Sequence, residues 1–130
     1  LWMTLPHAVP FVPLPPTTNF FADASSTGLG VITEQAALAV ITRPDRHIFF
    51  REATAWLLAA LLAPPRTIIH TDNLALRRAL TSGHLRVLPW QMCISFSLLS
   101  IKGHLRARWI PTDLNPADRP SRIPHHFRPL

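Results

Sequence analysis

The sequence predicts a mixed α/β fold in which helices flank one sheet. Three observations support this prediction. Three strand patterns precede the first long helical stretch, a fourth follows that helix directly, and a fifth follows two further helical stretches. The chain of 130 residues has the length of one domain and contains no internal repeat. We therefore expect a single layered domain with one core.

Residues 1–19 are expected to form an extended connector from an upstream domain. Five prolines fall in this stretch, and prolines at that density remove backbone donors and fix φ. The chain opens on Leu rather than Met, which suggests a piece of a longer polypeptide. We expect the folded domain to span residues 20–122, and a tail of Pro, His and Arg residues to occupy 123–130.

Three strands are expected first, at residues 20–23, at 28–33 and within 36–50. The run from Phe20 to Ala22 is apolar and predicts a buried strand, small polar residues and glycines at 25–30 turn the chain, and Val31 and Ile32 start the return strand. The dipeptide Pro-Asp at 44–45 is a candidate turn within the third region. The first two strands therefore predict a hairpin with Asp23 at its centre.

Helices and two more strands follow. Residues 51–63 are strong helix formers that stop at two prolines, and because they are apolar around the circumference we expect this helix to be nearly buried. Residues 67–70 read as a strand in a covered sheet. Helices are expected at 74–81 and at about 89–102, then a last strand at 105–110 and a loop at 111–116.

The charge balance favours a nucleic-acid partner. Thirteen Lys and Arg residues against seven Asp and Glu give a net charge of +6, and twelve of the thirteen are arginine. Arginine suits planar, bidentate recognition of phosphate. A basic surface that matches a neighbouring acidic domain would give the same balance, so charge alone leaves both interpretations open.

Other classes of protein are disfavoured. The single cysteine, Cys93, lies in an apolar stretch, so neither a disulfide framework nor a Cys-based zinc site is expected. The seven histidines show no compact metal spacing. No apolar run is long enough to span a bilayer, and the N-terminal residues lack the pattern of a secretory signal. We expect a protein that is not secreted and has no membrane partner.

Four of the seven acidic residues fall at predicted strand ends or helix starts, which is where open α/β sheets place ligands. Each has a purely structural alternative: Asp23 as a turn residue, Glu52 as a helix-dipole partner in a first helical turn, Asp72 as an N-cap, and Asp118 as the cap of a short helix. Converging carboxylates would repel and raise one another's pKa unless divalent cations neutralise them, and Mg²⁺ suits such oxygen ligands. The four residues are Asp23, Glu52, Asp72 and Asp118.

Their order and surroundings carry a resemblance to a known family. The motifs are FADA at 21–24 with TGLG at 27–30, TDN at 71–73, and the long LNPADRPSR at 114–122. Together they resemble a type 1 ribonuclease H domain, and more closely the ribonuclease H end of hepadnavirus-type reverse transcriptases, over about residues 20–122. The resemblance implies a ribonuclease H-like fold, with a mixed five-stranded sheet of three antiparallel strands followed by two parallel ones.

The resemblance also implies an activity. Asp23, Glu52, Asp72 and Asp118 are expected to be catalytic carboxylates that bind two Mg²⁺ ions about 4 Å apart, with Mn²⁺ as a substitute. The implied reaction is hydrolysis of the RNA strand of RNA/DNA hybrids during viral reverse transcription. The implied partners are the hybrid and an upstream reverse transcriptase domain, and the implied location is the viral nucleocapsid or host cytoplasm.

Discrimination of RNA from DNA requires contacts to 2′-hydroxyls across a wide minor groove. Polar side chains beside the carboxylates are candidate donors, although such residues in turns often serve their own backbone: Ser25, Ser26, Thr27 and Asn73. Four arginines are candidates for phosphate contacts, or for solvated faces of a helix and an edge strand: Arg77, Arg78, Arg106 and Arg108. The tryptophans Trp56, Trp90 and Trp109 are expected in the core or at domain contacts.

The chain departs from the family pattern in two places. Leu29 stands where those viruses usually carry Trp, and the segment between Asp72 and Asp118 is somewhat longer. Many cellular members also have a catalytic-loop His before the fourth carboxylate. The one candidate here is His104, which lies beside a strand and is not assigned that role.

Two other functions compete with this interpretation. A non-catalytic domain of the same fold could bind nucleic acid as a spacer in a larger polymerase, and the four carboxylates argue against it. A DDE-type integrase or transposase core lacks a Glu that opens the first helix after the third strand, and it has no place for the Asn-Pro-Ala-Asp motif.

Overall fold

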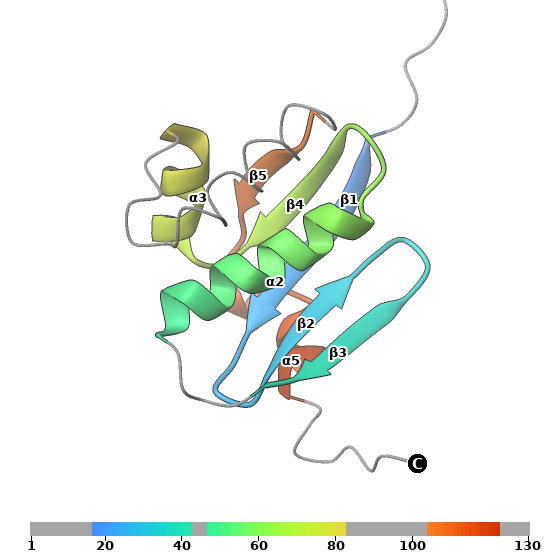
Figure 1. Ribbon diagram of the computed structural model, residues 1–130. Coiled ribbons are helices and arrows are strands. Elements are labelled where there is room, and N and C mark those ends of the chain that lie inside the picture. Colours follow the sequence, from blue (N-terminus) through green and yellow to red (C-terminus); the bar gives the residue numbers. More distant parts are fainter. Residues whose placement is uncertain (1–16, 43–46, 83–103, 123–130) are drawn as a thin grey trace, which may run out of the picture.

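The computed structural model describes residues 17–42, 47–82 and 104–122, and their strands form one five-stranded sheet in the order β3-β2-β1-β4-β5 (Figure 1). Strands β1 (Thr18–Ala24), β2 (Gly28–Ile32) and β3 (Ala37–Ile41) are antiparallel neighbours. Strands β4 (Thr67–Thr71) and β5 (Arg106–Trp109) run parallel to β1. This arrangement confirms the predicted sheet of three antiparallel strands followed by two parallel ones.

Helices cover both faces of the sheet. Helix α2 (Ile48–Leu62) crosses one face, and the short helix α5 (Asp118–Arg122) lies on the opposite face against β2 (Figure 1). Helix α3 (Leu74–Ser82) follows β4, and a 3-10 helix (Thr112–Leu114) lies in the loop between β5 and α5. The connection from β4 to α3 and the connection from β5 to the 3-10 helix therefore both begin at the carboxyl end of the parallel strands.

The start of α2 differs from the prediction. The helix begins at Ile48, so Phe49 and Phe50, which fell in the region expected to hold the third strand, are helical. His47 caps the helix, because its Nδ1 accepts a hydrogen bond from the Phe49 amide at 3.1 Å. Glu52 therefore lies beyond the first turn, and the helix-dipole explanation for its position was wrong.

Strand β1 is also longer than predicted. It begins at Thr18, so Thr18 and Asn19 belong to the sheet rather than to the connector. The structure does not test the remaining domain boundaries. The expected helix at 89–102, which includes Trp90 and Cys93, lies outside the described residues. So do residues 1–16 of the connector and the whole tail.

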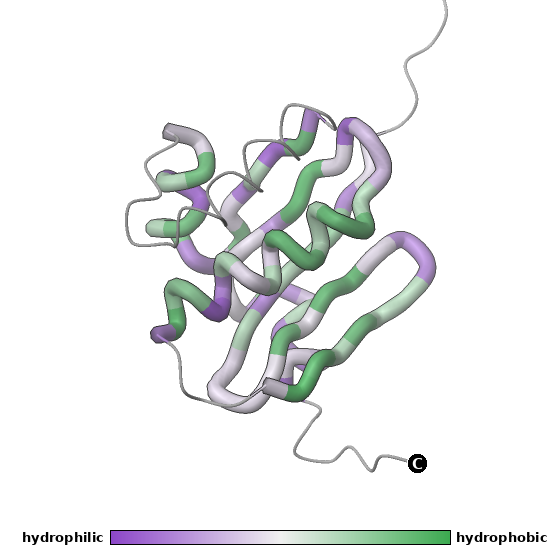
Figure 2. The backbone as a smooth tube through the Cα atoms, viewed as in Figure 1, coloured by the Kyte–Doolittle hydropathy of each residue, from purple (hydrophilic) through white to green (hydrophobic). Residues whose placement is uncertain are grey.

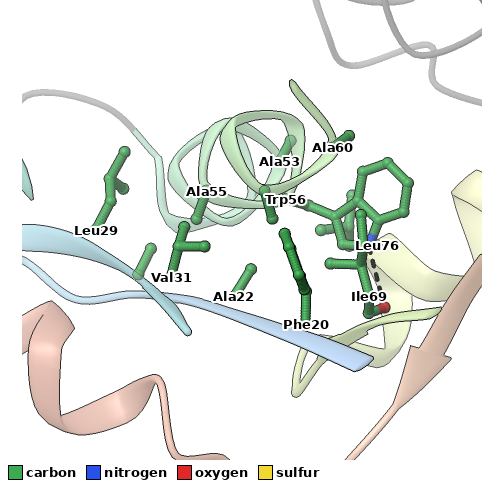
Figure 3. Close-up of a cluster of buried hydrophobic side chains, with 12 residues drawn as sticks. Phe20, Ala22, Leu29, Val31, Ala53, Ala55, Trp56, Ala60, Ile69 and Leu76 are labelled. Atoms are coloured by element: carbon green, nitrogen blue, oxygen red, sulfur yellow. Dashed lines mark hydrogen bonds between the residues drawn. The ribbon is translucent and has the colours of Figure 1, made fainter. Parts of the chain in front are cut away.

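The core lies between α2 and the sheet (Figure 3). Trp56 is 1% exposed, as expected of a core residue, and its Nε1 donates a hydrogen bond to the Ile69 carbonyl at 3.2 Å. The small residues Ala53, Ala55, Ala59 and Ala60 bring the helix close to the strands.

Apolar residues make up most of the length of α2 (Figure 2). Leu61 and Leu62 are exposed, so the helix is less buried than the sequence predicted. Within the described residues, no helix is long and apolar enough to cross a membrane.

Candidate active site

Three of the four predicted carboxylates converge at one end of the sheet. Asp23, Glu52 and Asp72 each offer a carboxylate oxygen, and these oxygens all lie within 4.8 Å of one another. Asp23 and Glu52 are buried, and Asp72 is half-buried. This end of the sheet therefore gathers three acidic side chains within reach of one another.

The sheet register explains how two of the three meet. Strands β1 and β4 are parallel, and Phe21 on β1 is paired with His70 on β4. Asp23 and Asp72 each lie two residues further along, so both carboxylates reach the carboxyl end of the sheet side by side. This is the edge at which open α/β sheets bind ligands.

Glu52 joins them from α2. Its Oε1 accepts a hydrogen bond from the Ala24 amide at 3.3 Å, which fixes the side chain against the end of β1. Its Oε2 is buried and has no hydrogen-bond partner among the described residues. A buried carboxylate oxygen without a partner is costly, so this atom calls for a cation or a proton.

The protonation of the cluster reflects its burial. Burial, and then the charge of Asp72, raise the pKa of Asp23 to about 7. Burial, and then the charges of Asp23 and Asp72, raise the pKa of Glu52 to about 9. Burial also raises the pKa of Asp72, with a contribution from the charge of Asp118. Repulsion was predicted, but burial is the larger cause.

The donor set fits a hard divalent cation. Three carboxylates supply oxygen ligands, which Mg²⁺ prefers, and one of those oxygens lacks any other described partner. A bound cation would favour the charged carboxylates and remove the mutual repulsion.

Asp118 lies next to this cluster but outside the three that share the 4.8 Å separation. It is the first residue of α5, and its Oδ1 accepts from Arg122 Nε at 3.1 Å. Its charge still acts on Asp72, as the raised pKa of that residue shows. The fourth carboxylate is therefore adjacent to the cluster and paired with a basic side chain.

Two contacts that the sequence did not predict attach α5 and the loop before it to the sheet, one from Asn115 to β1 and one from Ala117 to Gly30 of β2, and two further hydrogen bonds lie within the attached segment. Asn115 donates from Nδ2 to the Ala22 carbonyl at 3.1 Å, and its Oδ1 accepts from the Ala117 amide at 3.0 Å. Ser121 donates its hydroxyl to the Asp118 carbonyl at 2.6 Å. A Cβ at Gly30 would lie 2.4 Å from the Ala117 carbonyl oxygen, so only glycine permits this approach.

A family model described as DNA polymerase (viral) C-terminal domain matches residues 8–130. The chain belongs to this family. No curated protein matches the sequence. Among solved structures, this polymerase C-terminal domain is similar to the crystal structure of LC11-RNase H1 in complex with RNA/DNA hybrid, with a TM-score of 0.63 and 13% identity over 79% of this chain and 92% of that one. The domain thus has a ribonuclease H fold, as the resemblance implied.

The polar residues around the cluster of this polymerase C-terminal domain differ in availability. Ser25 is buried, and it donates its hydroxyl to the Ser121 carbonyl at 2.6 Å. Thr27 is half-buried, and its hydroxyl oxygen lies 3.2 Å from the Ser25 hydroxyl oxygen. Ser26 is exposed, and its side chain makes no hydrogen bond to another described residue. Of the three hydroxyls, Ser26 is therefore the one open to a substrate.

Asn73 caps α3, because its Oδ1 accepts from the Leu76 amide at 2.9 Å. The N-cap role considered for Asp72 therefore belongs to Asn73, which keeps the Asp72 carboxylate available. The Nδ2 of Asn73 makes no hydrogen bond to another described residue.

The four candidate arginines lie on α3 and β5. Arg77 and Arg78 are in α3, one turn after Asp72, and Arg106 and Arg108 alternate on β5. Arg78, Arg106 and Arg108 are exposed, and Arg77 is half-buried. Arg108 is paired with His70, whereas Arg106 is paired with Ile68 and lies further from the end of the sheet that holds the carboxylates.

Trp109 and His104 lie at opposite ends of β5. Trp109 is 44% exposed rather than in the core, and its Nε1 donates to the Asp72 carbonyl at 3.2 Å. His104 precedes β5, at the opposite end of the sheet from the carboxylates. Its position gives no support to a catalytic role.

The raised pKa values predict an unusual dependence of stability on pH. Between the ordinary pKa values of 3.8 and 4.5 and the raised values of about 7 and about 9, the folded state holds protons that the unfolded chain has released. Stability without metal should therefore fall as pH rises from about 5 to about 9. Thermal melts across this range test it. Glu52→Gln should make the melting temperature less dependent on pH. An unchanged pH dependence in that variant would contradict the raised pKa of Glu52.

Proposed function

We propose that this domain is a ribonuclease H: a metal-dependent endonuclease that hydrolyses the RNA strand of RNA/DNA hybrids during viral reverse transcription. The observation that carries the proposal is the convergence of Asp23, Glu52 and Asp72, with the unpartnered Glu52 Oε2 among them. Membership of the viral polymerase family and the ribonuclease H fold support it.

The proposed cofactor is Mg²⁺, in two ions, with Mn²⁺ as a substitute. Asp23, Glu52 and Asp72 would hold it, and Asp118 would complete the ligand set from α5. When bound, such ions activate water and stabilise the leaving oxygen of a phosphodiester. Because Arg122 now pairs with Asp118 on an exposed surface, the pair is weak enough to yield to a cation.

The remaining residues would bind and orient the substrate. Among the described residues, the Ser26 hydroxyl and the Asn73 side-chain amide make no hydrogen bond to another residue through their donors, and we propose them as contacts to the RNA strand. Ser25 and Thr27 would act indirectly, by shaping the turn that presents Ser26. Phosphate contacts are proposed for the four arginines of α3 and β5: Arg77, Arg78, Arg106 and Arg108.

The proposed partners are the hybrid itself and an upstream reverse transcriptase domain in the same polypeptide. Membership of a family of viral polymerase C-terminal domains supports the second partner. The similar LC11-RNase H1 structure is a complex with an RNA/DNA hybrid, which supports the first. We place the reaction in the viral nucleocapsid or the host cytoplasm.

A comparison of three duplexes tests the substrate class. The domain should cleave the RNA strand of an RNA/DNA hybrid in Mg²⁺, and should leave RNA/RNA and DNA/DNA duplexes of the same sequence intact. Labelling each strand in turn identifies the strand that is cut. Equal cleavage of the DNA strand would overturn the assignment, and binding without cleavage would indicate a non-catalytic spacer domain.

A further inference from the structure

A hydrogen-bonded junction joins the three elements that carry Asp23, Glu52 and Asp118. Ser25, in the turn after β1, lies at its centre. The Ser25 carbonyl accepts from Arg51 Nε at 2.7 Å, and the Ser25 hydroxyl donates to the Ser121 carbonyl at 2.6 Å. One residue thus links α2, the β1–β2 turn and α5.

Both ends of this junction lie next to carboxylates. Arg51 directly precedes Glu52 in α2, and it also donates to the Thr42 hydroxyl. Ser121 donates to the Asp118 carbonyl at 2.6 Å and lies 3.5 Å from Asp23 Oδ2. The links run almost entirely through backbone carbonyls and hydroxyls, so the carboxylate oxygens stay available as ligands.

The turn fixes the direction of the Ser25 hydroxyl. Its oxygen accepts from the Thr27 and Gly28 amides, both at 3.2 Å, and its one hydrogen is left for the Ser121 carbonyl. Ser25 is 5% exposed, so water cannot readily replace this bond. Loss of the hydroxyl would leave a carbonyl and two amides without this partner.

Thr33 provides a natural comparison within the same chain. Its hydroxyl accepts from the Gln35 and Ala36 amides at 3.2 and 3.0 Å, as Ser25 does in its own turn. It donates to the Ala36 carbonyl at 3.2 Å, inside the same turn. Thr33 therefore has the turn function of Ser25 without a link to another element.

We propose that Ser25 is a positioning residue, which holds Asp118 in register with Asp23 and Glu52 and thereby sets the affinity of the site for its divalent cation. This inference rests on the proposed function. Partners in the outer shell of metal ligands typically change metal affinity by about 10- to 100-fold. Asn115 ties the same segment to β1 independently, so loss of Ser25 loosens α5 without releasing it.

Ser25→Ala, Ser25→Thr and Thr33→Ala test the proposal against the wild-type domain. We expect Ser25→Ala to raise the Mg²⁺ concentration for half-maximal cleavage about tenfold or more. It should also reduce the rise in melting temperature on adding Mg²⁺, and speed hydrogen exchange of the Ser121 amide without metal. Ser25→Thr keeps the hydroxyl and should restore all three values, and Thr33→Ala should match the wild type in its metal response.

Several results would overturn the proposal. One is a Ser25→Ala variant that melts earlier but keeps the wild-type Mg²⁺ response, because the role would then be structural alone. Unchanged hydrogen exchange of the Ser121 amide in Ser25→Ala would also overturn the proposal, and this measurement does not depend on cleavage. A wild-type domain that cleaves no hybrid would refute the proposed function instead. Should Ser25→Ala fail to fold, Arg51→Lys removes the Nε bond to the Ser25 carbonyl at the other end of the junction. An unaltered Mg²⁺ response in that variant would also overturn the proposal.

Discussion

Asp72→Asn should abolish cleavage and leave the fold intact or more stable. Asparagine keeps the size of the side chain but removes a charge that raises the pKa of Asp23 and Glu52. The cap of α3 is unaffected, since Asn73 supplies it. We expect cleavage to fall by more than about 100-fold, because a direct ligand should matter more than its outer-shell partners.

The melting temperature without metal separates this outcome from simple unfolding. Relief of like-charge repulsion should keep it level or raise it by up to about 4 °C, which corresponds to about 1 kcal/mol in a domain of this size. Thermal melts of both proteins in chelator provide the measurement. A variant that melts well below the wild type would mean that Asp72 has a structural role.

Gly30→Ala should detach α5 and with it the fourth carboxylate. The added Cβ would lie 2.4 Å from the Ala117 carbonyl oxygen and 2.6 Å from the Ser121 amide nitrogen. Both atoms are backbone, so the helix must move. We expect a loss of about 1–3 kcal/mol in the free energy of unfolding, as for other overpacked sites, together with a severe loss of cleavage.

A loss of stability in Gly30→Ala would identify the contact with α5 as its cause, because alanine is ordinarily more favourable than glycine inside a strand. Ala37→Val adds methyl groups at an exposed position of β3 and serves as the control, with little change expected. Denaturant unfolding of the two variants makes the comparison. A Gly30→Ala variant as stable as the wild type would show that the contact with α5 is not tight.

Local patterns predicted much of the fold. The strand expected at 67–70 is Thr67–Thr71, and the helix expected at 74–81 is Leu74–Ser82. Branched apolar runs and a following polar turn define such elements over a few neighbouring residues, so tertiary contacts hardly alter them.

The beginning of α2 could not be predicted in the same way. Ile48, Phe49 and Phe50 have strand-type side chains, and histidine is not among the preferred N-caps. The structure nevertheless starts the helix there, where His47 caps it. Packing against the sheet outweighed local preference, and Glu52 moved from the expected first turn to the second.

The candidate site shows the same division. Asp23, Glu52 and Asp72 were predicted because each lies at or near the end of an element, and the structure brings their oxygens together. The contacts that hold α5 in place escaped prediction, since they join positions 96 apart in the case of Ser25 and Ser121, and 93 apart for Asn115 and Ala22. No spacing in the sequence reveals such pairs before the fold is known.

The carboxylate site itself is tested most directly by parallel preparations of the wild-type domain and Asp23→Asn, incubated with hybrid labelled in the RNA strand. Metal is first removed with a chelator, and Mg²⁺ is then added back. We expect the wild type to cleave the RNA strand only after Mg²⁺ is restored, and Asp23→Asn to leave it intact under both conditions. A contaminating nuclease would be present in both preparations, so equal Mg²⁺-dependent cleavage by the two would contradict a catalytic site built on Asp23.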